Sequence, residues 1–85
     1  MITIYGKNGC SYCTKARELC EKYDVNYEYK NTDENLDYLY EVLSRNQTMK
    51  TFPQIWWDDR HIGGYAELTS EFENLGIGNY GQGAF

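Results

Sequence analysis

The 85-residue sequence predicts one α/β domain in which a parallel strand–helix–strand unit is followed by an antiparallel hairpin and a last helix. Three observations predict this class. Apolar residues alternate with polar ones in short segments, they recur every three to four residues in longer segments, and glycine, proline or polar turn residues separate the segments. A chain of this length has room for one hydrophobic core, and its nine Tyr, three Phe and two Trp are too many for a disordered chain.

The first half of the chain is expected to form strand, helix and strand. Residues 1–5 alternate around Ile2 and Ile4 and end at Gly6, which is typical of a short strand. Residues 24–30 alternate again and predict a second strand with one wet face. Between them, residues 11–23 have helical spacing, and the predicted buried face consists of Cys13, Ala16, Leu19 or Cys20, and Tyr23.

The second half is expected to form helix, hairpin and helix. A helix capped by Thr32 or Asp33 should end near residue 46, and its predicted inner face consists of Leu36, Leu39, Tyr40 and Leu43. Pro53 cannot donate a hydrogen bond to a ladder, so it should precede a strand over 54–57, and residues 58–60 should turn into a partner strand at 61–62. The last helix follows Gly63 and Gly64 and ends at Gly76, and its predicted inner face consists of Leu68, Phe72 and Leu75.

Residues 76–85 are rich in glycine and have no usable period, so we expect a mobile tail there and a folded domain over residues 1–75. No apolar stretch approaches the roughly 18 to 20 residues of a membrane span, and the sequence starts in a strand without a basic leader, so we expect no membrane association and no targeting segment.

Charge and cysteine content narrow the function further. Eight Lys and Arg against thirteen Asp and Glu give a net charge of −5, which argues against a nucleic-acid or membrane binder held by bulk charge. Three cysteines are few for a secreted domain held together by disulfides, and because the number is odd, at least one thiol stays unpaired. A reducing, cytoplasmic compartment and cysteines with a chemical role are therefore the expectation.

Cys10 and Cys13 form a Cys-x-x-Cys motif between the end of a strand and the first turn of a helix. At a helix N-terminus, unpaired N–H groups and the helix dipole stabilise a thiolate over a thiol, so Cys10 should be the nucleophile. Two intervening residues place Cys13 on the same turn, within reach of Cys10 once a mixed disulfide has formed. The spacing thus predicts that Cys10 attacks and that Cys13 resolves.

A structural zinc site is the alternative interpretation of a Cys-x-x-Cys motif, but it needs two more soft or imidazole ligands. Only Cys20 and His61 remain. Cys20 lies on the apolar face of its helix and should pack as a small hydrophobe, and His61 follows a charged turn and should be solvated or hydrogen-bonded. We expect no metal.

Three motifs in order and at the right spacing resemble the glutaredoxins of the thioredoxin superfamily, over Met1 to about Leu75. They are Lys7 with Cys10-Ser11-Tyr12-Cys13, then Thr51-Phe52-Pro53-Gln54, then His61-Ile62-Gly63-Gly64-Tyr65. The length is similar to that of the short bacterial and phage members. The resemblance implies a thioredoxin-like fold, with a central four-stranded mixed sheet flanked by three helices, and it makes residues 1–75 a glutaredoxin domain.

The resemblance also implies a glutathione site. In the family the bond before the proline, here Phe52–Pro53, is cis, and the backbone of the preceding residue pairs with glutathione. Gly63 and Gly64 would leave a helix N-terminus open to the γ-glutamyl carboxylate, and Glu67 is a candidate for the ammonium group. The implied glutathione-binding residues are Lys7, Tyr12, Thr51, Phe52, Pro53, Gly63, Gly64 and Tyr65, with Arg45 or Lys50 as further candidates for the glycyl carboxylate.

The function implied is a glutathione-dependent thiol–disulfide oxidoreductase that reduces protein disulfides and glutathionylated substrates, with ribonucleotide reductase as one candidate client and a monomer as the expected state. Ser11 departs from the commoner proline at that position, and its hydroxyl is a potential donor to a cysteine sulfur. Two alternatives stay open. One is a redoxin that draws electrons from thioredoxin reductase, and the other is a carrier of a glutathione-ligated [2Fe–2S] cluster, which serine at that position permits.

Overall fold

Four strands and three helices follow one another along residues 1–76, the part of the chain that the computed structural model describes. The elements, in chain order, are β1 (Ile2–Gly6), α1 (Ser11–Lys22), β2 (Tyr27–Asn31), α2 (Leu36–Arg45), β3 (Gln54–Trp57), β4 (Arg60–Gly63) and α3 (Tyr65–Asn74). The order of elements and the mixed four-stranded sheet with three helices confirm the predicted fold class. Of the predicted tail, Gly76 lies in the turn after α3, and residues 77–85 lie outside the described residues.

The strands form one sheet in the order β2-β1-β3-β4. β1 runs parallel to β2 and antiparallel to β3, and β3 runs antiparallel to β4. The parallel pair needs a crossover, which α1 provides, whereas β3 and β4 are joined by a tight turn in which Asp58 has a φ of 57°. The central strand β1 therefore has a partner on both sides.

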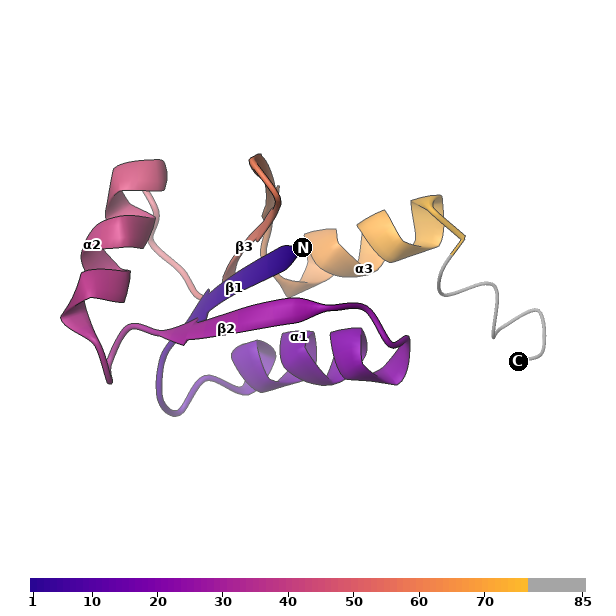
Figure 1. The fold of residues 1–85 in the computed structure, drawn as a ribbon, viewed down its shortest axis with the longest axis horizontal. Helices are drawn as coiled ribbons and strands as arrows, with labels where there is room; N and C mark the ends of the chain where they lie inside the picture. The colour runs from indigo at the N-terminus through magenta and orange to yellow at the C-terminus, as the bar shows by residue number, and fades with distance from the viewer. Residues whose placement is uncertain (77–85) are drawn as a thin grey trace.

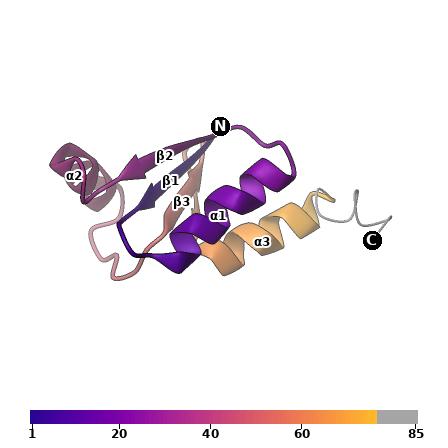
Figure 2. The ribbon, with the colours of Figure 1, turned by 90° about the horizontal axis from the view of Figure 1, so that it is seen from below.

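The sheet carries a hydrophobic core on each face, and Figures 1 and 2 show α1 and α3 side by side on one face with α2 on the other. Because neighbouring residues of a strand point to opposite faces, Ile4 of β1 faces α1 and α3 while Tyr5 faces α2. The larger core consists of Ile2, Ile4, Ala16, Cys20, Ile55, Leu68 and Phe72. The smaller one consists of Tyr5, Val42 and Trp56.

The face of α2 that packs on the sheet differs in part from the prediction, since Leu39 packs against the smaller core as expected. Leu36 and Tyr40 were expected inside, but they are 60% and 64% exposed, whereas Val42 is fully buried against Tyr5 and Trp56. Helical spacing defines apolar stripes but does not decide which stripe meets the sheet. The aromatic face of β1 and β3 makes that choice, and it selects the stripe that contains Val42.

The predicted cap of α2 is also wrong. Asn35 is the cap, and its Oδ1 accepts the N–H of Asp37 at 2.9 Å. Thr32 and Asp33 bind the loop after β1 instead: the Thr32 hydroxyl donates to the Gly6 carbonyl at 3.0 Å, and the Asp33 carboxylate accepts the Asn8 N–H at 2.9 Å. These short polar side chains satisfy loop groups before the helix begins.

One strand boundary and one predicted core residue also differ from the expectation. β2 begins at Tyr27 and not at residue 24, because Asp24 has a φ of 58° and the Val25 N–H returns to the Cys20 carbonyl at 2.8 Å, so residues 24–26 form the exit turn of α1. Leu75 is 56% exposed at the end of α3, so it is not part of the core, while Leu68 and Phe72 are buried as predicted.

Candidate active site

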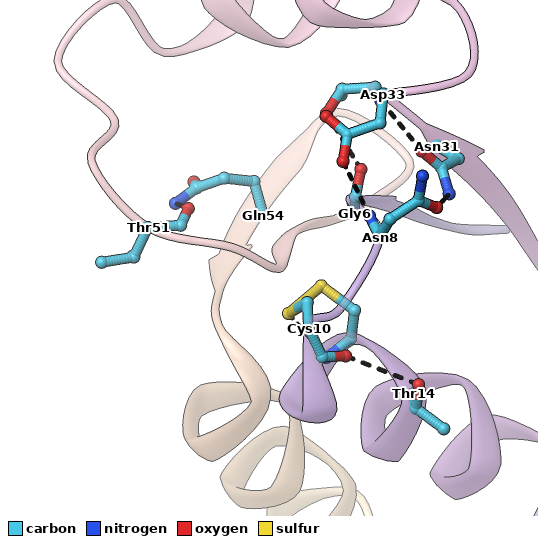
Figure 3. Close-up of a disulfide and its surroundings, with 10 residues drawn as sticks. Gly6, Asn8, Cys10, Thr14, Asn31, Asp33, Thr51 and Gln54 are labelled. Carbon is cyan, nitrogen blue, oxygen red and sulfur yellow. Dashed lines mark hydrogen bonds between the residues drawn. A yellow bond between two sulfur atoms is a disulfide. The ribbon is translucent and has the colours of Figure 1, made fainter.

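The cysteine motif lies where the carboxyl end of β1 turns into α1. Cys10 is the N-cap of α1, and its sulfur accepts the N–H of Cys13 at 3.1 Å. The two cysteines are joined in a disulfide with a Cα–Cα distance of 5.3 Å (Figure 3). Cys10 is partly exposed, whereas Cys13 is 1% exposed. An incoming group therefore reaches the sulfur of Cys10 before that of Cys13.

The surroundings of the Cys10 sulfur favour negative charge. The first turn of α1 leaves N–H groups without helical acceptors, and one of them, that of Cys13, already points at this sulfur. The first turn holds no acidic residue. Within residues 1–76 the Ser11 hydroxyl donates to neither sulfur, so the thiolate stabilisation available here comes from the backbone.

A network of short polar side chains holds the loop that carries Cys10. Gly9 has a φ of 71°, a left-handed conformation that favours glycine. On the preceding residue, the Asn8 side chain accepts from Asn31 at 2.9 Å, and its N–H donates to Asp33 (Figure 3). The network connects the loop to the end of β2. The position of Cys10 is therefore set by β2 through this loop as well as by the helix α1 that it caps.

A groove of about 270 Å³ lies beside the disulfide. One wall is the loop before β3, in which the Phe52–Pro53 bond is cis, in agreement with the expectation from the motif. The other wall is the start of α3, and the Tyr12 and Tyr65 rings pack at 5.8 Å between their centres. The groove is lined by Tyr12, Thr51, Phe52, Pro53, Gly64, Tyr65, Ala66 and Glu67.

Lys7 lies near the cis-proline loop without lining this groove, and the two glycines lie at the start of α3. The Lys7 ammonium lies 5.9 Å from the centre of the Phe52 ring, which places a positive charge next to the cis-proline loop. Gly64 lines the groove and caps α3, while Gly63 has a φ of 123° and precedes it. A side chain at Gly63 would meet Glu67, because an added Cβ would lie 2.9 Å from the Glu67 Cγ.

Glu67 turns back onto the start of its own helix. Its Oε1 accepts the Gly64 N–H at 2.8 Å, which is the reciprocal half of a capping box. The carboxylate thus lies in the groove and occupies a backbone donor at the N-terminus of α3. An anionic ligand group that binds this N–H has to displace it.

Three residues singled out in the sequence lie elsewhere or have other partners. The Arg45 guanidinium donates to the Tyr5 hydroxyl and to the Asp58 carbonyl, and it stacks on Trp56, so the structure does not bring it to the groove. Cys20 is fully buried, and burial, with the charge of Glu21, raises the pKa of its thiol to about 11. His61 stacks on the Trp56 ring and bonds to Gln54.

Sequence reasoning missed parts of both sides of the disulfide. Ala66 lines the groove but carries no chemical signal in the sequence. On the other side of Cys10 lies a hollow of about 420 Å³, in which Arg17 stacks on Tyr29 at 4.5 Å. The βαβ crossover brings these two residues together.

No group of three or more His, Cys, Asp or Glu that could hold a metal ion occurs within residues 1–76, and no helix described there is long and apolar enough to cross a membrane.

Comparison with known proteins identifies this arrangement. A family model described as glutaredoxin matches residues 2–62. The chain belongs to the glutaredoxin family. Glutaredoxin 1 of Rickettsia bellii is 42% identical over 71 residues, which cover 79% of this chain and 71% of that relative. Membership of the glutaredoxin family implies thiol–disulfide oxidoreductase activity, and it agrees with the Cys10–Cys13 pair at the start of α1.

Solved glutaredoxin structures have the same fold. The structure of reduced Escherichia coli glutaredoxin matches with a TM-score of 0.73 at 29% identity, over 86% of this chain and 93% of that one. A buckwheat glutaredoxin, solved as a glutathione complex, matches with a TM-score of 0.74 over 89% of this chain and 71% of that one. At 19% identity, the buckwheat glutaredoxin shows a likeness in fold alone.

Proposed function

We propose that this glutaredoxin is a glutathione-dependent reductase of protein disulfides and glutathionylated substrates. The observation that carries the proposal is the placement of a partly exposed Cys10 sulfur at a helix N-terminus, with the buried Cys13 next to it and a groove beside it. Exposure and helix position select Cys10 as the nucleophile. Burial keeps Cys13 for the intramolecular step.

The chemistry follows as a series of thiol–disulfide exchanges. The Cys10 thiolate attacks one sulfur of the substrate disulfide, and the other substrate sulfur leaves as a thiolate that takes up a proton. Cys13 then attacks the Cys10 sulfur, which releases the second substrate thiol and forms the Cys10–Cys13 disulfide. One glutathione opens this disulfide and remains on Cys10, and a second glutathione displaces it. The dithiol is restored, and the two glutathiones leave as one glutathione disulfide.

The groove supports a small anionic peptide as the ligand. The exposed backbone next to the cis bond at Phe52–Pro53 offers an edge for an extended peptide, and Thr51, Tyr12 and Tyr65 shape the walls. Lys7 would attract the glycyl carboxylate. The Gly63–Gly64 turn and the Gly64 N–H would receive the γ-glutamyl carboxylate once Glu67 moves, and Glu67 would then be free to meet the ammonium group.

Disulfide-containing proteins are the proposed clients, and ribonucleotide reductase is one candidate among them. A redoxin that depends on thioredoxin reductase would share the fold and the dithiol, so the electron donor decides between the two functions. The Lys7 charge near the cis-proline loop and the glycine turn beside the groove favour glutathione.

A pair of coupled assays tests the proposal. NADPH consumption is measured with glutathione and glutathione reductase in one assay and with thioredoxin reductase in the other, on the same glutathionylated peptide. We expect saturable turnover with glutathione and background rates with thioredoxin reductase. Turnover with thioredoxin reductase alone would reassign the electron donor.

A further inference from the structure

Gln54, the first residue of β3, has a buried polar side chain directly beneath the cis-proline loop. It is 6% exposed, and Thr32 is the other buried polar residue in the described part of the chain. A buried amide is costly unless its donors and acceptor are satisfied. The Gln54 amide makes three contacts, one to the loop above and two to flanking elements.

The partners determine which way the amide points. The Gln54 Nε2 donates to the Thr51 carbonyl at 2.8 Å, because a carbonyl can only accept. The Gln54 Oε1 then faces Asn46, whose Nδ2 donates to it at 3.2 Å, and the His61 Nε2 at 3.0 Å. That distance requires a proton on the His61 Nε2, so the histidine also acts as a donor. The two donors, on Asn46 and His61, thus hold the Gln54 amide in one orientation.

This orientation fixes the peptide plane between Thr51 and Phe52. The bond between them is trans, so its C=O and N–H point in opposite directions. With the Thr51 carbonyl held toward Gln54, the Phe52 N–H points away from β3 (the Gln54 and Thr51 side of this arrangement is drawn in Figure 3). Within residues 1–76 this N–H donates to no protein group. It is a free donor on the loop that walls the groove.

We propose that Gln54 is a positioning residue that presents the Phe52 N–H to the ligand, with His61 and Asn46 holding the Gln54 amide in place. The hydrogen bond to the Thr51 carbonyl also polarises the shared peptide group, which strengthens its N–H as a donor. The inference rests on the proposed function, because it assigns a role within glutathione recognition. Gln54 itself does not touch the reacting sulfurs.

Steady-state kinetics with a glutathionylated peptide test the role. Gln54→Met keeps the length of the side chain but removes its donors, and we expect KM to rise about five- to tenfold, the loss of one well-aligned hydrogen bond, while kcat changes less than about twofold. His61→Phe keeps a ring on Trp56 but removes one of the two donors that hold the Gln54 amide, so its KM should rise by about two- to threefold, less than in Gln54→Met. Ile55→Val, one residue further along β3, removes a buried methyl group and is the control for lost stability.

The outcomes separate this inference from the proposed function. A wild-type protein that does not saturate with the peptide contradicts the proposed function. A wild-type protein that saturates, with an unchanged KM in Gln54→Met or an equal rise in Ile55→Val, overturns the role of Gln54 alone. If Gln54→Met does not fold, wild-type NMR decides with S-methylglutathione as the probe. We expect a through-bond coupling between Gln54 Nε2 and the Thr51 carbonyl and a large downfield shift of the Phe52 amide, and the absence of either overturns the inference.

Discussion

At the scale of single residues, the chemistry depends on a difference between two cysteines three positions apart. Cys10 is the partly exposed helix cap and Cys13 is buried one turn inside the same helix. The third cysteine shows what the fold does to a thiol without this position: Cys20, on the apolar face of α1, has a pKa raised to about 11 by burial. The proposed roles of attacking, resolving and inert thiol therefore follow from where each cysteine lies on the same helix.

Serine variants of the two site cysteines test this division. Cys10→Ser should lower every activity to background, because no other exposed thiol occurs within residues 1–76. Cys13→Ser should keep the reduction of a glutathionylated peptide within about tenfold of wild type and lose at least about 100-fold on a protein disulfide, since only the latter needs the intramolecular step. Parallel assays on the two substrates measure the split, and equal losses in both would contradict it.

At the scale of elements, the contact of α2 with the sheet combines a small apolar core with a polar cluster. Val42 provides the buried apolar contact. Around it, Glu41 accepts hydrogen bonds from the Tyr5 hydroxyl and from Lys30, which lies at 2.6 Å, and Arg45 donates to the same hydroxyl at 3.1 Å. Residues from three elements thus meet at Tyr5, which is fully buried in β1.

Truncation of two α2 residues should show which face of the helix stabilises the fold. Val42→Ala removes buried methyl groups and leaves a small cavity, so the free energy of unfolding should fall by about 1.5 to 3 kcal/mol. Tyr40→Ala, on the 64% exposed side, should change it by less than about 0.5 kcal/mol. Urea unfolding, monitored by circular dichroism, compares the free energies of unfolding of the two variants. Similar decreases in both would contradict the packing of α2 through Val42.

The polar cluster should make stability depend on pH. The hydrogen bond from Lys30 has the largest effect on the Glu41 carboxyl. Together with the hydrogen bond from Tyr5, it holds the pKa of Glu41 below its ordinary value of 4.5. A lowered folded-state pKa means that Glu41 stabilises the fold above about pH 4.5 and that this contribution is lost as the pH falls below it. Because the Glu41 side chain is 39% exposed, solvent screening limits the contribution to about 1 kcal/mol.

Glu41→Gln isolates this contribution from those of the other carboxyl groups. The variant should be less stable than wild type by about 1 kcal/mol at pH 7, and the difference should shrink toward pH 3, as the wild-type carboxyl takes up a proton. Urea denaturation of both proteins at the two pH values measures it. A difference that is the same at pH 3 and pH 7 would show that charge on Glu41 does not contribute.

At the scale of the whole molecule, the site is assembled from segments far apart in the sequence at one end of the sheet. Residues 7–13, the cis-proline loop and the start of α3 meet there. Each copy of the protein has a net charge of −5, which opposes association between copies. This charge favours the expected monomer over a dimeric cluster carrier.

Anaerobic reconstitution tests that preference. With iron, sulfide and glutathione, the protein should stay colourless and elute as a monomer in size-exclusion chromatography, and it should retain its thiol activity. Glutaredoxin of the same concentration without iron serves as the control. A coloured dimer that contains glutathione would assign the cluster-carrier function that Ser11 permits.

The sequence by itself determined the order of elements, the α/β class and the dithiol at a helix start, because these depend on local periodicity and on residue types a few positions apart. It also located the loop with Pro53 and the glycine turn, since their signals are single residues with restricted or open backbones. Its errors on α2, which concerned the cap and the buried face, arose where side chains at several nearby positions satisfied the same local rule.

Only the tertiary structure decided which of those equivalent choices the chain makes. Val42, and not Tyr40, packs against the aromatic rings of Tyr5 and Trp56. The Asp33 carboxylate accepts the N–H of Asn8, so it does not cap α2. Likewise, the Arg45 guanidinium contacts Tyr5 and Trp56 and does not reach the groove. The Gln54 amide binds Asn46 at the end of α2 and His61 of β4. These outcomes depend on contacts between residues distant in sequence, whose free energy exists only once the sheet has brought them together.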